Sequence, residues 1–504
     1  MTSHRQKHSA RLNKKKRRGI RKTGIRVLCI VSLFCLSGCA VGPDFVRPEP
    51  PQVDHYTQGK DPTTTIPADG QVQYFKQSAK VVEDWWRLFN STRLDAVVKE
   101  AISNNQSLQA AQAALRQSRE NLRAGYGVFF PQLDAGFDAT RQKFSPARFG
   151  GSSPASTFNL FTLSATVSYA LDVFGGERRA VESLQAQVDF QRFTVIGTYL
   201  TLTGNTINTI IAQAAYREEI KATEQIISLL REQTGITEAQ AQAGTVPYAN
   251  VLSLRSQLAA FEATLPPLRQ KLDQSGHLLA TLAGRTPAEW ASPQINLADL
   301  NLPADLPITL PSQFVRQRPD ILAAEAQLHS ASADIGVATA ALFPSFTLNG
   351  SYGFNNTSMG DLFKSGSSIW ALGANVTAPL FHGGTLWFHR KAAIEAYQQS
   401  LATYRQTVLS AFAQVADTLR ALEHDAEALS AQSQALDAAG EALRLIQVNY
   451  QAGTVNYLQV LAADNQYHQA KIGYLQTQAQ RLQDTVALFI ALGGGWWNPG
   501  KIMS

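Results

Sequence analysis

A cysteine near the start of the chain carries the clearest chemical signal. Cys39 follows Leu36-Ser37-Gly38 at the end of the apolar run 27–36, and eleven Lys and Arg residues with no acid precede it. A basic stretch, an apolar run and small residues before a cysteine are typical of a secretory signal of the lipoprotein type. In that chemistry the thiol takes a diacylglyceryl group, cleavage frees the cysteine amine, and the amine is acylated. We therefore predict a signal peptide at 1–38 and lipidation of Cys39.

The alternative for this segment is a signal-anchor helix that contains a cysteine by chance. The run 27–36 is too short for that, because a helix needs ~20 apolar residues to span a bilayer. No later segment of the chain offers 18 uninterrupted apolar residues. The anchor that we expect is therefore a covalent lipid, with no other cofactor.

The charge and the cysteines exclude several classes of function. The formal charge of +6 comes from the signal segment, because residues 39–504 hold 34 basic and 39 acidic residues. The mature chain thus gives no support for a nucleic-acid partner. Cys29 and Cys35 leave with the signal. Without a free thiol, disulfides, thiolate catalysis and cysteine metal sites are excluded.

The elements that must position any further site belong to an internal tandem duplication. Residues 242–252 read QAGTVPYANVL and residues 451–461 read QAGTVNYLQVL, with eight of eleven positions identical at an offset of 209. Three other landmarks recur in the same order. They are the Phe-Pro steps at 130–131 and 343–344, the glycine pairs at 175–176 and 383–384, and the glycines at 284 and 493. Four shared landmarks indicate one structural unit written twice.

Each repeat contains two segments in which apolar and small polar residues alternate. The alternation is strict over 161–171, 346–354 and 370–380 and fainter over 133–139. Strands of about ten residues with one apolar face are typical of membrane β-barrels. A half-buried soluble sheet is the alternative, but its edges would stay open inside a helical lipoprotein. We predict strand pairs at about 132–172 and about 345–380.

Each strand pair is followed by a long helical stretch and a returning helix. The stretches 177–243 and 385–452 contain no proline and would each reach ~100 Å if continuous. Gly244 and Gly453 suit the position just after a helix end, so each duplicated motif predicts the tip of a helical hairpin. An ordinary coiled-coil bundle is the alternative, and it does not explain the strands.

Four strands cannot close a barrel, and in lipid every backbone group must be paired. Closure therefore requires several chains, and three of them would supply twelve strands, a size found among outer-membrane barrels. The predicted boundaries are a signal peptide at 1–38, a lipidated Pro-rich tail and belt segment at 39–90, and a first repeat at 91–300. A second repeat at 301–497 and a C-terminal tail at 498–504 complete the chain.

The mature chain resembles the TolC/OprM-like outer-membrane factors, of the NodT-type lipoprotein branch. The resemblance rests on the motif CAVGPDF at 39–45, on Trp85-Trp86 with Phe89, on both AGTV tips and on Arg318-Pro319-Asp320. It implies an α+β membrane protein: a homotrimer with a twelve-stranded outer-membrane β-barrel, four strands per chain, continuous with a long periplasmic α-helical barrel. It further implies the exit channel of a tripartite efflux pump for toxic small molecules, partnered by a periplasmic adaptor and an inner-membrane transporter.

The resemblance also assigns roles to the tips at about 244–252 and 453–461. Adaptor docking and gating are expected there, at Gly244, Thr245, Val246, Gly453, Thr454 and Val455. Leu458 matches a leucine that narrows the pore in relatives, whereas the family's aspartate position is Ala462 and the nearest acid is Asp464. Arg255 occupies the position of the first repeat that corresponds to Asp464. A link between the two is one alternative, and a solvated role for both is the other.

Two other functions compete with this expectation. One is the outer-membrane duct of a type I protein-secretion system, which the lipoprotein signal disfavours. The other is a lipid-anchored periplasmic enzyme or scaffold. No Gly-x-Ser-x-Gly motif, phosphate loop or close pair of histidine ligands supports an enzyme, so no catalytic residue and no metal site are expected.

Overall fold

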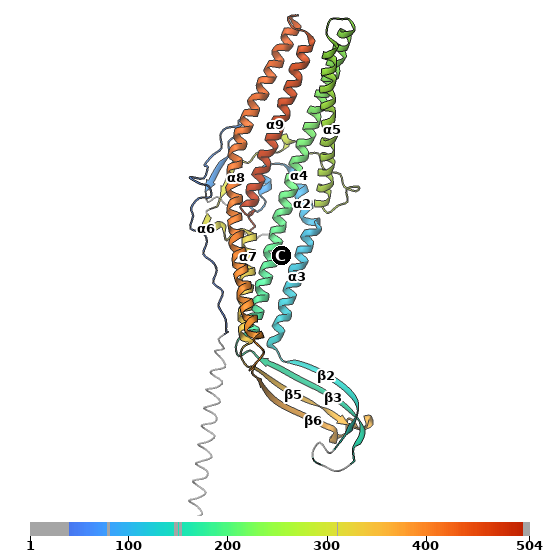
Figure 1. Cartoon of the computed structure of the whole chain (residues 1–504), viewed down its shortest axis with the longest axis vertical. Helices are drawn as coiled ribbons and strands as arrows, with labels where there is room; N and C mark the ends of the chain where they lie inside the picture. Colours follow the sequence, from blue (N-terminus) through green and yellow to red (C-terminus); the bar gives the residue numbers. More distant parts are fainter. Residues whose placement is uncertain (1–39, 78–80, 146–149, 151–153, 310, 497–504) are drawn as a thin grey trace, which may run out of the picture. The chain divides into compact units, whose positions relative to one another are not determined.

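The computed structural model describes residues 40–77, 81–145, 150, 154–309 and 311–496. The predicted signal peptide, Cys39, Trp497 and the tail at 498–504 lie outside the described residues. The chain folds as two compact units (Figure 1). The strand unit holds the described residues of 40–47, 117–188 and 326–402, and the hairpin unit holds those of 48–116, 189–325 and 403–496. Each unit draws on both repeats, so the repeat boundary is not a boundary between compact units.

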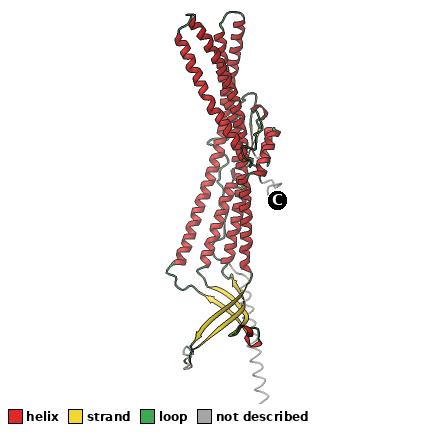
Figure 2. Cartoon of the chain, turned by 90° about the vertical axis from the view of Figure 1, so that its right-hand side faces the viewer, coloured by secondary structure: helices red, strands yellow, loops and turns green. Residues whose placement is uncertain are grey.

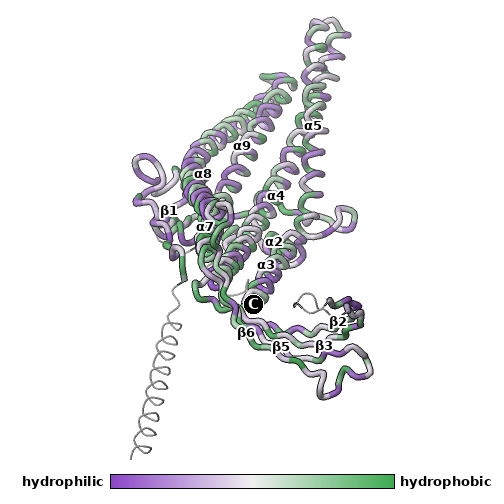
Figure 3. Tube along the Cα trace, turned by 60° about the horizontal axis from the view of Figure 1, so that its bottom comes forward, coloured by the Kyte–Doolittle hydropathy of each residue, from purple (hydrophilic) through white to green (hydrophobic). Residues whose placement is uncertain are grey.

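The strand unit contains a four-stranded antiparallel sheet in the order β2-β3-β5-β6. β2 (Gln132–Phe144) and β3 (Ser156–Leu171) come from the first repeat, and β5 (Ser345–Asn356) and β6 (Ser368–Thr377) from the second. The repeats meet where β3 pairs with β5, from Leu171 opposite Phe346 to Phe161 opposite Asn356. Figure 3 shows hydrophobic and hydrophilic residues interleaved along these strands. The alternation predicted all four strands, and the last ends three residues before Leu380.

Helices extend from this sheet and begin where polar groups satisfy their first N–H groups. α4 (Gly176–Gln242) starts beside Asp172, whose carboxylate accepts the backbone N–H groups of Glu177 and Arg178 at 3.0 and 3.1 Å. An acceptor at this place satisfies donors that a helix start leaves free. α3 (Gln106–Gly125) and α7 (Pro319–Ala340) lead into the strands, and α8 (Thr385–Gln451) leaves them. Pro319 opens α7, as the sequence predicted.

The hairpin unit contains two antiparallel helical hairpins. α4 returns through α5 (Tyr248–Leu282), and α8 returns through α9 (Tyr457–Ala491) (Figures 1 and 2). Corresponding helices have the same length, since α4 and α8 each hold 67 residues and α5 and α9 each hold 35. The repeats differ within α5, which contains Pro266 and Pro267 at positions where α9 has Leu475 and Gln476.

Smaller elements cover one side of the hairpin unit. A short helix at Trp85–Phe89 precedes α2 (Thr92–Asn104), and β1 (Tyr74–Gln77) pairs in parallel with β4 (Asp305–Ile308). Trp85 is fully buried and stacks on Phe489 at 5.0 Å between ring centroids. Trp85 and Trp86 are thus both buried in this unit. The sequence did not predict β1 or β4.

Candidate functional site: the two hairpin tips

The first tip stops its long helix with a Schellman motif. Gly244 has a φ of +73°, a left-handed conformation that glycine adopts without strain. The N–H of Thr245 donates to the carbonyl of Gln240 at 2.9 Å, and the N–H of Gly244 donates to that of Ala241 at 3.1 Å. The hydroxyl of Thr245 adds a third bond to the Gln240 carbonyl at 2.8 Å. The Gly-Thr pair thus satisfies carbonyls that the helix end leaves free.

The second tip repeats this geometry. Gly453 has a φ of +74°, and its N–H donates to the carbonyl of Tyr450 at 2.9 Å. Thr454 donates to the carbonyl of Asn449 twice, from its N–H at 3.0 Å and from its hydroxyl at 2.9 Å. Both glycines therefore occupy the helix-end position predicted for them. Adaptor docking at these residues stays a prediction.

The two tips differ in how the returning helix begins. Asn456 caps α9, since its side chain accepts the N–H of Gln459 at 3.1 Å. The equivalent residue before α5 is Pro247, whose side chain makes no capping bond. Val246 and Val455 are half-buried, whereas Gly244, Thr245, Gly453 and Thr454 are exposed. Each tip therefore exposes its glycine and its threonine.

The second tip is tied to the first hairpin by Tyr457. Its phenol is hydrogen-bonded to Glu232 of α4, and this bond is the main reason why the pKa of Tyr457 is raised. The ring of Tyr457 also lies 5.3 Å from that of Tyr450, between centroids. Leu458 follows directly and is half-buried. The sequence showed Tyr457 only as a landmark of the repeat, because nothing in it pairs α9 with α4.

The structure gives Arg255 and Asp464 separate partners. Arg255 pairs with Glu238 at 2.8 Å, while Asp464 lies 3.5 Å from the ring of His468. Burial lowers the pKa of His468, and the charge of Asp464 opposes that shift. Among the residues that the structure describes, no ion pair joins Arg255 to Asp464, so the link considered from the sequence does not form within one chain. Equivalent places in two repeats need not be in contact.

The Arg255–Glu238 pair belongs to a regular ladder across the first hairpin. Three ion pairs join α4 to α5, each with a closest distance of 2.7 or 2.8 Å, and their polarity alternates along the hairpin. They are Glu224–Arg269, Arg231–Glu262 and Glu238–Arg255. Successive rungs are seven residues apart on both helices, which keeps them on one face of an antiparallel pair. The heptad spacing of these charges was available in the sequence and was missed.

The second hairpin has no counterpart of this ladder. The corresponding positions are Ser433, Gly440 and Gln447 on α8 and Asp464, Lys471 and Gln478 on α9. Among the described residues of α8 and α9, the ion pairs found lie within one helix, and none crosses from one helix to the other. Two acids, Asp425 of α8 and Asp484 of α9, instead share a hydrogen bond across this hairpin.

Those two acids lie beside a buried arginine. Arg481 is 1% exposed and donates to Gln73 at 3.1 Å and to Thr65 at 3.2 Å, so it fastens the N-terminal tail to α9. Burial, and then the hydrogen bond and charge of Asp484, raise the pKa of Asp425 to about 8, against the attraction of Arg481. Near neutral pH the two carboxyls therefore hold a proton between them.

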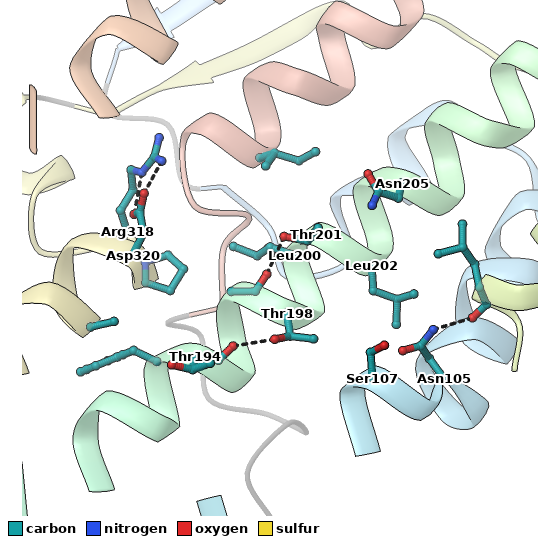
Figure 4. A pocket seen from close by; sticks show the side chains of 16 residues that line it. Asn105, Ser107, Thr194, Thr198, Leu200, Thr201, Leu202, Asn205, Arg318 and Asp320 are labelled. Carbon is teal, nitrogen blue, oxygen red and sulfur yellow. Dashed lines mark hydrogen bonds and ion pairs between the residues drawn. The ribbon is translucent and has the colours of Figure 1, made fainter. Parts of the chain in front are cut away.

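A cavity of about 560 Å³ lies where four helix ends meet along α4 (Figure 4). The hydroxyls of Thr194 and Thr198 face it in Figure 4 and donate back to carbonyls of their own helix at 2.9 Å. Its charged wall residues, Arg318 and Asp320, are paired with each other. The cavity wall thus presents hydroxyls, amides and apolar groups.

A family model decides which class of protein carries this fold. The model described as outer membrane efflux protein matches residues 97–285 and 310–494, one match for each repeat. The chain belongs to the outer membrane efflux protein family. It is therefore an outer-membrane efflux channel and not an enzyme.

Named relatives cover nearly the whole of this efflux channel. The chain is 32% identical over 429 residues to the pyoverdine export outer membrane protein OpmQ of Pseudomonas aeruginosa, covering 84% of this chain and 89% of the relative. It is 28% identical over 476 residues to the probable outer membrane lipoprotein SilC of Salmonella typhimurium, covering 94% and 99%. The similarity therefore extends over the tail, both repeats and both tips.

Solved channels have the same fold. The outer-membrane channel OprN matches with a TM-score of 0.79 at 27% identity, covering 91% of this chain and all of that one. The open state of the MtrE channel of Neisseria gonorrhoeae matches with a TM-score of 0.78 at 26% identity, covering 91% and 98%. The predicted membership of the outer-membrane factors and the predicted mixed helix and strand fold are confirmed.

The described part of this efflux channel contains neither a metal-binding cluster nor a membrane-spanning helix. Within that part, no group of three or more His, Cys, Asp or Glu side chains could hold a metal ion. No helix among the same residues is long and apolar enough to cross a bilayer.

Proposed function

We propose that three copies of the chain form the exit duct of a tripartite pump that expels toxic small molecules through the outer membrane. The observation that carries the proposal is the sheet with two open edges. β2 and β6 each pair with one neighbour in the chain, and both strands are exposed along their whole length. In lipid the free N–H and C=O groups of those edges must find partners. Three four-stranded sheets joined edge to edge would close a twelve-stranded barrel.

The mass of the protein in detergent tests this assembly. We expect a trimer by light scattering and, for the native lipoprotein, the mass of a lipidated Cys39. Gly136→Pro in β2 and Ala374→Pro in β6 should prevent the trimer, because proline removes a backbone donor and does not fit a strand that must pair on both sides. Thr357→Pro, in the loop after β5, is the matched control and should leave it intact. A wild-type chain that leaves the membrane as a monomer without detergent contradicts the proposal.

The tips supply the gate in this proposal. The second tip narrows the duct with Leu458, and the Tyr457–Glu232 bond holds the closed position. The exposed glycines and threonines of both tips receive a periplasmic adaptor, and an inner-membrane transporter drives export. Tyr457→Phe should raise the open probability in planar bilayers, because it removes only the hydroxyl. Tyr450→Phe is the control, and equal effects of the two variants would contradict the lock.

The cargo class is tested in cells. Relatives carry names such as toluene efflux pump and antibiotic efflux pump outer membrane protein. Deletion of the gene should sensitise cells to hydrophobic toxins, and the intact gene should restore resistance. A secreted protein that is retained in the deletion strain, with no change in toxin susceptibility, would instead identify a type I secretion duct.

A further inference from the structure

The residues after Cys39 lie in a defined position on the strand unit. Residues 40–45, here called the docking peptide, pack against α4 and α7. The N–H of Val41 donates to the carbonyl of Phe174 at 2.9 Å, and the carbonyl of Val41 lies 3.4 Å from Nε of Arg179. The docking peptide thus bonds through its backbone to the chain between β3 and α4.

Three glycines make this close approach possible. A Cβ added at Gly175 would lie 2.5 Å from Cα of Ala40, and one at Gly42 would lie 2.5 Å from Cα of Gly336. A Cβ at Gly336 would lie 2.6 Å from Arg179 and 3.0 Å from the carbonyl of Val41. Real side chains do not approach this closely, so each of the three positions requires glycine. The backbone of the docking peptide therefore lies directly against the backbone at Gly175 and Gly336, and this contact surface is here called the slot.

A charged and aromatic contact fixes the far end of the docking peptide. The side chain of Arg179 is 6% exposed and bridges Asp44 at 2.6 Å and Glu182 at 2.7 Å. Phe45 stacks on His329 at 4.3 Å between centroids, with the rings 15° from parallel. His329 in turn lies 2.9 Å from Glu182. The peptide therefore contacts α4 of the first repeat and α7 of the second at once.

We propose that this slot is the receptor for the lipidated N-terminus, and that it sets the point at which the acyl chains leave the protein. The inference rests on lipidation of Cys39, which belongs to the proposed function. Ala40 contacts Gly175, four residues after β3 ends at Leu171, so the slot holds the anchor at the periplasmic end of the strands. The slot also ties α4 to α7, where Ser183 and Ser330 already share a hydrogen bond of 2.8 Å.

Cross-linking tests the seating directly. The mature chain has no cysteine besides Cys39, whose thiol the lipid occupies. In a variant with two introduced cysteines, a cross-link can therefore join only those two thiols. In the full lipidated protein, Phe45→Cys with His329→Cys should be joined by a short bifunctional thiol reagent. Phe45→Cys with Ala338→Cys is the matched control. Position 338 lies nine residues beyond His329 on α7, which places it about 13 Å farther along the helix. Equal cross-linking of both pairs, or none of either, would overturn the proposal.

A second variant closes the slot and leaves the lipid in place. Gly336→Leu should abolish the cross-link and open the Phe45–Val46 bond to chymotrypsin, while the mass still shows the acyl groups. Gly235→Leu is the control, since nothing lies within 4 Å of a Cβ added there. If the Gly336→Leu protein stays protected from chymotrypsin at Phe45, the proposed role of the slot is wrong. A wild-type chain that cross-links but carries no lipid rejects the lipidation instead.

Discussion

The two helical hairpins share one geometry and differ in chemistry. Corresponding helices have equal lengths, and both tips end in the same Schellman motif with the same threonine bond. Three ion pairs of alternating polarity join α4 to α5. The second hairpin has instead a pair of acids, Asp425 and Asp484, between α8 and α9. The duplication therefore kept the backbone and changed what holds the helices together.

The two hairpins differ in how firmly their helices are held in register. Ion pairs seven residues apart fix the register of α4 against α5, since a shifted register would bring like charges together. In the second hairpin a glycine, Gly440, faces Tyr467, where a Cβ would lie 3.5 Å from the ring. The helices of the first hairpin are thus joined by ion pairs, and those of the second by side-chain packing and a pair of acids. Four predictions test this contrast, from the largest expected effect to the smallest.

Removal of Arg481 should have the largest effect. Arg481→Ala leaves Gln73, Thr65 and the two acids without their buried cation, and loss of one partner in a buried charged network costs about 3–5 kcal/mol. We expect a lower free energy of unfolding of the protein in detergent and early release of the N-terminal tail. Leu272→Ala, at the equivalent place in the half-buried face of α5, is the control and should cost less. Equal losses would show that the network contributes only packing.

The acid pair should make the second hairpin sensitive to pH. The folded pKa of Asp425 is about 8 and its ordinary value 3.8, so stability is present at low pH and is lost as pH rises toward 8. Amide exchange in α8 and α9, corrected for its intrinsic rate, should rise severalfold per pH unit up to about 8 and then level off. Because solvent reaches the acid pair, the rise in exchange rate per pH unit should stay below the ~tenfold limit that the loss of one proton sets.

The control for this pH effect is in the same chain. Asp425→Asn should flatten the profile. Exchange in the ladder segment 224–269 should stay flat in both proteins, because its contacts between α4 and α5 pair an acid with an arginine. A first hairpin that loosens in parallel with the second would show that the acid pair is not the cause.

Shortening of the second tip should have a moderate effect. Leu458→Ala removes the apolar side chain proposed to narrow the duct, so single-channel conductance in planar bilayers should rise severalfold. The first-tip variant Leu252→Ala removes a leucine that is 53% exposed and should leave conductance unchanged. Unchanged conductance in Leu458→Ala rules out the apolar constriction, and equal increases would remove the distinction between the hairpins.

Loss of one rung of the ladder should have the smallest effect. Glu262→Gln unpairs Arg231, and an exposed ion pair contributes less than ~1 kcal/mol. Thermal unfolding in detergent should shift slightly at low salt, and the shift should vanish at high salt. Conductance should stay unchanged, because the variant leaves the second hairpin untouched. Glu423→Gln, which unpairs a bridge within α8, is the control for a pair that joins no second helix.

Much of the fold could be predicted because its signals are local. Strict alternation predicted the strands of the sheet, and the absence of proline predicted two helices of equal length. Gly244 and Gly453 predicted the tips because a left-handed helix end favours glycine. The duplication also helps, because an element that is predicted in one repeat supports the prediction of the same element in the other.

The contacts between distant segments could not be predicted in this way. Arg481 meets Gln73 across 408 residues, and no periodicity encodes that pairing. Arg255 was compared with Asp464 because the repeat aligns them, yet contact follows the register of α4 with α5, which gives Arg255 to Glu238. Tyr457 was recognised as part of a motif, and only the placement of α9 beside α4 reveals its bond to Glu232.

The open edges of β2 and β6 have a consequence for the life of the newly made chain. In the proposed trimer each chain must first cross an aqueous compartment alone, and during that transit both edges are free to pair with any extended peptide. A folded sheet would then be a hazard to its neighbours. We therefore expect an escort that shields the strands until insertion, and accumulation of insoluble chains when export outpaces the supply of that escort.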